Sequence, residues 1–155
     1  MNWEVTLTIH YTFTSQIVIS FTIPGKPIPL KRHRPSARGG YYDPSSTDKK
    51  QVWLQIARHK PKRPFAGDVR IFMMFFLPRP KHHYRTGKYK HLLKDRCKDI
   101  IYHSVKPDLD NMVKLICDTI QGKDRMIHDD SQICVIQAEK KYGNPPRTIV
   151  IVEEI

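Results

Sequence analysis

The nine residues from Val69 to Leu77 constrain the fold of this chain more than any other segment. All of them except Arg70 are apolar, and β-branched and aromatic side chains dominate the run. A short continuous apolar run of this composition predicts a well-buried strand. Pro78 and Pro80 then end the strand, because proline cannot donate a hydrogen bond to a β-ladder.

Alternating apolar and polar residues predict strands in four more segments, namely residues 3–13, 17–23, 133–142 and 148–154. The first would be an extra strand in an N-terminal extension of residues 1–16. The last two would form a final strand pair, joined by a turn at residues 143–146. Pro24 and Gly25 end the strand that precedes a basic loop over residues 26–44.

Two segments have helical spacing. In the first, residues 47–60, Thr47 can cap the first turn and Pro61 stops the helix. The second begins near Asp108 or Asp110 and ends at Gly122. Its expected apolar stripe consists of Leu109, Val113, Ile116 and Ile120. Together these elements predict an α+β single domain over residues 17–155, a mixed four- to five-stranded sheet with two main helices.

The charge is divided unevenly along the chain. The net charge is +12, and residues 26–106 hold 21 Lys or Arg against five Asp. Residues 107–130 reverse the sign, with six Asp against three cationic residues. A basic body attracts polyanions, whereas clustered carboxylates attract hard cations. We therefore expect a metal-dependent enzyme that acts on nucleic acid.

Composition also bears on membrane association, cellular location and metal binding by histidine. No apolar run approaches the ~18 residues of a membrane span, so no membrane partner is expected. The three cysteines are far apart and form no Cys-x-x-Cys motif. A reducing, cytoplasmic location is therefore expected. His82, His83, His91 and His103 are numerous enough for a metal site, but their spacing lacks a partner motif and favours surface or DNA-contact roles.

The acidic segment carries the candidate chemistry. Asp108 and Asp110 lie at the start of the second predicted helix, and Asp129 and Asp130 follow that helix. If Asp130 folds back beside the first pair, three carboxylates converge, and oxygen ligands suit Mg²⁺ or Mn²⁺ but not zinc. Helix capping explains one Asp at this position but not the whole cluster. Lys114 lies one turn past Asp110, where it either assists phosphodiester hydrolysis or forms a simple salt bridge with Asp110.

The ordered motif of Lys106-Pro-Asp-Leu-Asp-Asn-Met-Val-Lys114, a helix ending at Gly122, and Asp129-Asp-Ser-Gln132 resembles the RusA family of Holliday junction resolvases. Residues 21–29 and 42–44 are similar to that family as well. The resemblance covers residues 17–155. It implies that Asp108, Asp110 and Asp130 bind magnesium and that Lys114 is the essential lysine.

The same resemblance implies a biological role. Asp129 matches the acid next to the third ligand and is kept as a further candidate for the metal. Members of the family act as homodimers that make paired nicks in a four-way DNA junction, in recombination and repair. A C₂ dimer suits this substrate, because a four-way junction has approximate two-fold symmetry. No small-molecule cofactor is expected.

Basic residues outside the acidic segment are candidates for DNA contact. They fall into two groups: Lys26, Lys31, Arg32, Arg34 and Arg38, accompanied by Tyr41 and Tyr42, and Lys81, Arg85, Lys88, Lys90, Lys94, Arg96 and Lys98. The first group would hold the DNA backbone next to the site. The second would form a flexible clamp that becomes ordered on DNA. Solvated loops are the alternative for both groups.

Two other functions remain open on the sequence. Pro107-Asp108 and Glu139-Lys140-Lys141 superficially fit the PD…ExK pattern of restriction-like nucleases, although that arrangement leaves Asp110 and Asp130 unexplained. A non-catalytic basic protein that binds DNA or RNA would account for the charge. It would not account for the acidic segment.

Overall fold

The structure is a computed structural model that describes residues 17–155, so the strand expected over residues 3–13 lies outside the described residues. The main elements, in chain order, are β1 (Val18–Pro24), β2 (Arg34–Pro35), β3 (Tyr41–Tyr42), α1 (Ser46–Ile56), β4 (Val69–Leu77), α2 (Leu109–Ile120), β5 (Ile133–Tyr142) and β6 (Arg147–Glu154). They confirm the α+β expectation of a mixed sheet with two helices. In the part of the chain that is described, none of the helices is long and apolar enough to cross a membrane.

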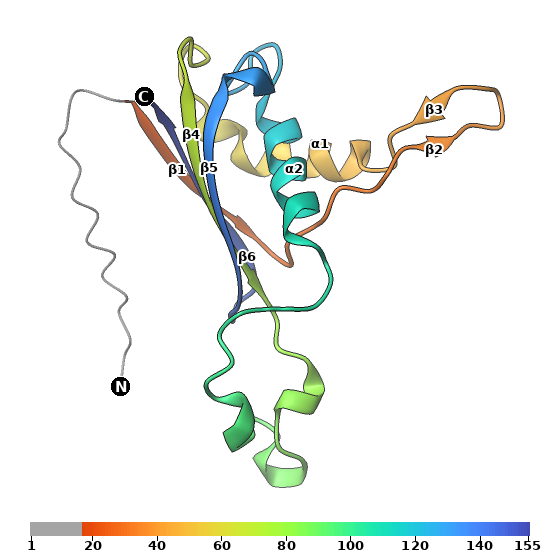
Figure 1. Cartoon of the computed structure of the whole chain (residues 1–155), viewed down its shortest axis with the longest axis vertical. Helices are drawn as coiled ribbons and strands as arrows, with labels where there is room; N and C mark the ends of the chain where they lie inside the picture. The colour runs from red at the N-terminus through yellow and green to blue at the C-terminus, as the bar shows by residue number, and fades with distance from the viewer. Residues whose placement is uncertain (1–16) are drawn as a thin grey trace.

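The four long strands form one mixed sheet in the order β1-β6-β4-β5 (Figure 1). The predicted buried strand is confirmed as β4, which pairs in parallel with β5 and antiparallel with β6. The expected pairing of the last two strands is wrong, because β4 lies between them. The turn that joins them crosses the end of β4, where the amide of Gly143 donates to the carbonyl of Leu77 (2.9 Å). Placing the most apolar strand inside the sheet pairs both of its edges.

Both helices cover the same face of the sheet (Figure 1). Alternate residues of β4 point into the core beneath them, and all five are buried: Val69, Ile71, Met73, Phe75 and Leu77. The predicted stripe of α2 is only partly right, because Leu109 and Val113 are half-buried. The buried positions are Met112, Leu115, Ile116, Cys117, Thr119 and Ile120. The buried face is wider than predicted because α2 packs against both the sheet and α1.

The start of α1 also differs from the prediction. The residue that precedes the helix is Ser45, not Thr47, and its side chain makes no capping hydrogen bond. Instead, its fully buried hydroxyl accepts a hydrogen bond from the backbone amide of Lys31 (2.8 Å). A long-range contact has thus replaced the local cap. The helix ends at Ile56 and continues as the 3-10 helix η1 (Ala57–His59).

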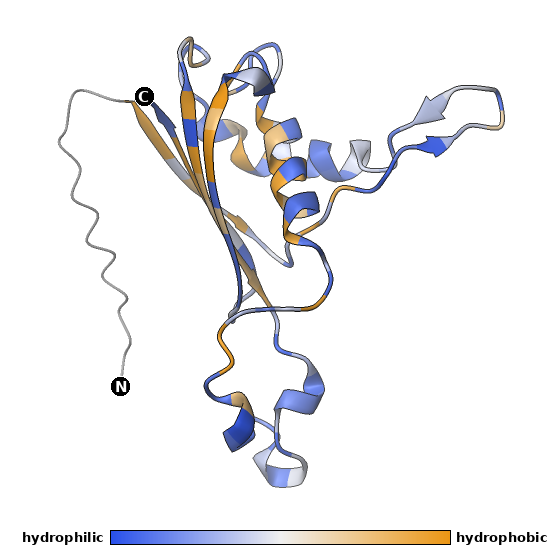
Figure 2. Cartoon of the chain, in the orientation of Figure 1, coloured by the Kyte–Doolittle hydropathy of each residue, from blue (hydrophilic) through white to orange (hydrophobic). Residues whose placement is uncertain are grey.

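The second face of the sheet carries no helix among residues 17–155 (Figure 1). We call it the open sheet face. Its centre is apolar and partly exposed, and consists of Phe72, Met74 and Phe76 from β4 with Ile149 and Ile151 from β6. In the hydropathy view these strands are mostly apolar, whereas the two projections of the molecule are mostly polar (Figure 2).

One projection is the β2–β3 hairpin, inside the segment expected to be a loop. The other is residues 79–106, which we call the lobe; it contains η2 (Lys81–His83), η3 (Gly87–Tyr89) and η4 (Asp95–Cys97). The Arg79 guanidinium donates to the carbonyls of Cys97 (3.0 Å) and Ile100 (2.6 Å). The amide of Lys94 donates to the carbonyl of His83 (2.9 Å). The lobe is therefore held by its own hydrogen bonds.

Candidate active site

Asp108 and Asp110 lie at the start of α2. Asp108 occupies the position before the first helical residue, with an extended backbone (φ −75°, ψ 141°), yet its side chain makes no capping hydrogen bond. Asp110 lies in the first turn. Both residues are exposed, and neither carboxylate has a hydrogen-bond or ion-pair partner among the described residues. Capping therefore does not account for Asp108.

Lys114 is exposed one turn further along α2. The salt bridge with Asp110, which was the simple alternative for this lysine, is not formed in the described chain. The next acid on this side of the helix, Asp118, pairs with Lys49 of α1 (3.5 Å). Lys49 also pairs with Asp43 (2.5 Å) and holds the pKa of that carboxyl below its ordinary value. Asp118 thus links the two helices, whereas Lys114 projects freely near Asp110.

The second acidic pair lies in the turn that leads into β5, and its two members differ. Asp129 accepts a hydrogen bond from the amide of Ser131 through Oδ1 (3.0 Å) and caps the 3-10 helix η5 (Asp130–Gln132). Hydrogen bonding to Ser131 lowers the pKa of Asp129. Asp130 is exposed, and its carboxylate has no hydrogen-bond or ion-pair partner in the described chain. Asp130 is therefore the better metal-ligand candidate, because Asp129 is engaged in the turn.

Gln132 fixes this turn, and no function was predicted for it. Its Oε1 accepts hydrogen bonds from the amides of His128 (2.8 Å) and Asp129 (3.2 Å). Its Nε2 donates to the carbonyls of Phe65 (2.9 Å) and Gly67 (3.0 Å). The amide group thus uses both donor hydrogens and accepts twice. The spacing Asp129-x-x-Gln132 is that of a capping box, a signal that the sequence does carry.

The first acidic pair lies at the start of α2, and the second lies near its end, in the turn that leads into β5. The backbone amide of Asp130 donates to Oε1 of Gln121 (2.9 Å), which directly follows the helix. Burial, aided by the charges of Asp118 and Asp130, raises the pKa of Cys117 to about 11. Asp130 is therefore near the second half of the helix, whereas Asp108 precedes its first residue, and 12 helical residues rise about 18 Å.

Among residues 17–155, no three His, Cys, Asp or Glu side chains stand close enough together to hold an ion. The structure thus brings Asp108 and Asp110 to one helix end but does not bring Asp130 into a three-ligand group with them. Carboxylates repel one another unless a cation or a proton neutralises them. The donor set nevertheless suits a hard cation, since all three are exposed, unpaired oxygen ligands in a strongly basic chain.

An open groove of about 430 Å³ adjoins Asp108. Its other lining residues are Pro29, Leu30, Lys106, Pro107 and Asn111. The amide of Leu30 donates to the carbonyl of Asn111 (2.9 Å), which joins the segment before the hairpin to the first turn of α2. The groove therefore lies where the chain segments from both projections meet.

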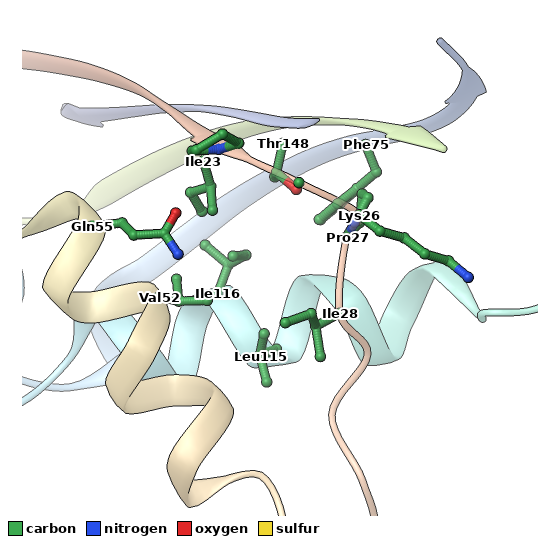
Figure 3. A pocket seen from close by; sticks show the side chains of 12 residues that line it. Ile23, Lys26, Pro27, Ile28, Val52, Gln55, Phe75, Leu115, Ile116 and Thr148 are labelled. Carbon is green, nitrogen blue, oxygen red and sulfur yellow. The ribbon is translucent and has the colours of Figure 1, made fainter. Parts of the chain in front are cut away.

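A second cavity lies between β1, α1 and α2 (Figure 3). Ile23, Val52 and Leu115 are among the mostly apolar side chains that line it, and the side chain of Lys26 points away from them. Its volume is about 40 Å³, which is far below the ~300 Å³ of a typical ligand pocket. This cavity is a gap in the core and holds no candidate chemistry.

The predicted DNA-contact residues lie on both projections and beside the groove. Most of these residues are exposed, namely Lys26, Lys31, Arg32, Arg34 and Arg38 on the hairpin side and Lys81, Arg85, Lys88, Lys90, Arg96 and Lys98 on the lobe; Lys94 is half-buried. Three of the candidates also form ion pairs inside the protein. Lys31 pairs with Asp48 (2.8 Å), and both Arg85 (2.9 Å) and Lys98 (2.6 Å) pair with Asp95. Tyr41 and Tyr42 are exposed in β3.

The PD…ExK alternative requires Glu139 to lie on the same side of the sheet as Asp108. Successive side chains of a strand point to opposite faces of the sheet. Glu139 forms an ion pair with Lys141 on the open sheet face, in register with Met74. Lys140 points to the other face, where its ammonium reaches the carbonyl of Pro107. The carboxylate of Glu139 is thus on the side of the sheet away from Asp108, so the PD…ExK arrangement is not formed.

Two of the four histidines form a ring cluster with Tyr142 at the base of the lobe. His83 and His103 are both buried, with ring centroids 5.2 and 4.8 Å from that of Tyr142. Burial lowers the pKa of each, so the neutral form is favoured. Nδ1 of each has no hydrogen-bond partner in the described structure. The surface role expected for His83 and His103 is therefore wrong, because both rings pack inside the structure.

Comparison with known proteins gives two findings. The family model described as "Endodeoxyribonuclease RusA" matches residues 24–153. A protein of Bacillus subtilis (strain 168), named "Uncharacterized protein YqaN", is 31% identical over 142 residues, which cover 88% of this chain and 96% of that protein. The family match includes both acidic pairs, Lys114 and Gln132, and confirms the resemblance drawn from the sequence motif.

Proposed function

Because the chain belongs to the RusA family of endodeoxyribonucleases, we propose that it resolves four-way DNA junctions by paired nicks, with Mg²⁺ held by Asp108 and Asp110, and with Asp130, which stands apart from that pair within one chain, also required for cutting. The observation that carries the proposal is the state of these carboxylates. They are exposed and have no partner among residues 17–155, in a chain of net charge +12, whereas most other carboxylates of that range have a cationic or hydrogen-bond partner. Such carboxylates are available to an external cation.

The bound metal would neutralise a phosphate oxygen and lower the pKa of the attacking water. The protein's own residues have separate tasks. Asp108, which precedes α2, and Asp110, in its first turn, would hold the ion. Lys114, which is free of Asp110, would stabilise negative charge on the phosphate in the transition state. The groove beside Asp108 would receive the DNA backbone, with Lys106 on its wall.

The two basic projections would hold the arms of the junction. The β2–β3 hairpin and the lobe extend from the body of the protein on different sides of the start of α2 (Figure 1). Contacts with phosphates supply affinity that weakens with salt but carries little sequence information. Recognition would then depend on the shape of the branched DNA more than on its sequence.

The open sheet face is the surface we assign to a homodimer. Its charged residues nearly cancel, with Arg70, Lys141 and Arg147 against Glu139 and Glu153. This nearly neutral face is therefore unsuited to DNA, which binds positive charge. It is also the face through which a second copy can pack without strong charge repulsion. The four strands lie about 4.8 Å apart and are roughly eight residues long, so the open sheet face has an area of roughly 500 Å². Two copies that pack through this face would bury ~1,000 Å², which is the lower limit of a specific interface.

Cutting of a synthetic four-way junction, with linear duplex and single-stranded RNA as controls, tests the catalytic proposal. We expect symmetric nicks that require Mg²⁺, complete loss of cutting in Asp110→Asn and Asp130→Asn, and retained junction binding in both. Asp124→Asn is the matched control, because it removes the same charge from an exposed residue whose positive φ (59°) suits asparagine. Wild-type cutting by Asp110→Asn would refute the site, and junction binding without any nicks would favour a non-catalytic binding protein.

Sedimentation of the wild type and of Met74→Asp tests the dimer. A carboxylate at the centre of an apolar interface is costly, so this variant should be monomeric while its circular dichroism stays that of a folded protein. Leu54→Asp is the control, because Leu54 is 76% exposed on α1, away from the open sheet face. If Met74→Asp sediments as the wild type does, the interface lies elsewhere.

A further inference from the structure

Lys140 is the residue of β5 that reaches the segment preceding the acidic site. It is paired with Phe75 of β4, so its side chain points to the helix-covered face of the sheet. Its ammonium donates to the carbonyl of Val105 (2.7 Å) and to the carbonyl of Pro107 (2.7 Å). Pro107 directly precedes Asp108. Charge-assisted hydrogen bonds of this kind are stronger than neutral ones.

These two hydrogen bonds are the last attachment of the lobe before α2 begins. The backbone of β5 first holds the returning chain, through the amide of His103 on the carbonyl of Lys140 (3.0 Å) and the amide of Tyr142 on the carbonyl of Ile101 (2.9 Å). Across residues 104–107 of the described chain, no further hydrogen bond to the body of the protein is formed. Val105 is 58% exposed, so packing does not hold this segment either.

We propose that Lys140 is a positioning residue for the acidic site, a role that rests on the proposed metal-dependent cutting. By fixing the carbonyls of Val105 and Pro107, it sets where Asp108 stands and how α2 begins. Two carboxylates near the start of a helix bind an ion well only if their backbone is held in place. Loss of residues that orient metal ligands typically lowers metal affinity by about 10- to 100-fold.

Lys50 offers a control with the same charge. It is exposed on α1, and among the described residues it makes no hydrogen bond to the segment before Asp108. Lys140→Met and Lys50→Met therefore remove one positive charge each, but only the first removes the hydrogen bonds to Val105 and Pro107. If overall charge alone mattered, the two variants would behave alike.

The test is the Mg²⁺ concentration that gives half-maximal cutting of a four-way junction, measured well below the unfolding temperature of each variant. We expect it to rise about 10- to 100-fold in Lys140→Met, to stay unchanged in Lys50→Met, and to return most of the way in Lys140→Arg, whose guanidinium can donate to two carbonyls. An unchanged Mg²⁺ requirement in Lys140→Met, or an equal rise in Lys50→Met, overturns the proposal.

Hydrogen–deuterium exchange of metal-free protein separates this proposal from the proposed function. Peptides covering residues 104–112 should exchange faster in Lys140→Met than in the wild type and Lys50→Met. If the wild type fails to cut any junction, the proposed function is wrong, yet exchange still shows whether Lys140 holds this segment. Unchanged exchange in Lys140→Met overturns the anchoring role whatever the cutting assay gives.

Discussion

Replacing Gln132 tests whether one side chain holds the turn that carries Asp130. In Gln132→Ala, four backbone groups lose their partner. A hydrogen bond contributes about 0.5–1.5 kcal/mol net, with the low end for exposed groups. Only the contact with Phe65 is partly buried, so the expected loss of unfolding free energy is roughly 2–3 kcal/mol.

Gln132→Glu is the sharper variant, because it keeps the accepting oxygen and removes the donor. Its carboxylate would face the carbonyl oxygens of Phe65 and Gly67 without a hydrogen between them. Urea denaturation followed by circular dichroism should show a loss similar to that of Gln132→Ala, and junction cutting should slow because Asp130 is held less firmly. Gln51→Glu, at an exposed position of α1, is the control and should be neutral within about 0.5 kcal/mol. Equal stability of Gln132→Glu and this control would refute the reasoning.

Three further predictions follow from the fold. Burial lowers the pKa of His83 and His103 in the folded state, so the unfolded chain takes up protons first as pH falls. The free energy of unfolding should therefore decline from about pH 6.5 downward, before the carboxylates titrate. Urea denaturation of a His83→Phe/His103→Phe variant should show a free energy of unfolding that changes less with pH. In Gly143→Ala the new Cβ would lie 2.6 Å from Cδ1 of Phe76, which should cost roughly 1–3 kcal/mol and lower Tm by several degrees; an unchanged Tm would mean that the ring moves freely. Junction affinity should fall steeply as salt rises from 50 to 200 mM in a filter-binding assay, and a flat response would exclude the basic projections as phosphate contacts.

The parts of the fold that the sequence predicted are those determined locally. The bounds of β4 follow directly from its apolar run and the prolines after it. Strand order was not predictable in the same way, because a four-residue turn between two strand patterns suggests a hairpin. In the structure β4 lies between β5 and β6 instead. This order depends on how the whole sheet buries its apolar residues, which a local pattern does not record. The β2–β3 hairpin was missed because each strand has only two residues.

The residues of the candidate site show the same difference between what is local in the sequence and what depends on long-range contacts. The acidic residues and Lys114 were found from their spacing, since charge density along the chain is visible in the sequence. The contacts of Lys140 with Val105 and Pro107, and of Gln132 with Phe65 and Gly67, span 33 to 67 residues of sequence, which no local pattern records. Only the capping box of Gln132 with Asp129 is local. That Asp118 pairs with Lys49 while Lys114 stays free also depends on how the two helices meet.

The lobe leaves the sheet after Leu77 and returns along β5 at residues 101–103, so its two ends are attached at neighbouring strands. Between these points, Arg79 and His83 contact the ring of Tyr142 in β5, and the other contacts described above are hydrogen bonds and ion pairs inside the lobe. The lobe contributes no residue to the buried hydrophobic core cluster of the described chain. Its length can therefore change in evolution or by engineering with little penalty to the sheet. The distance that the lobe extends and the stability of the sheet can then be changed separately. Lys140 lies where the lobe and the sheet meet.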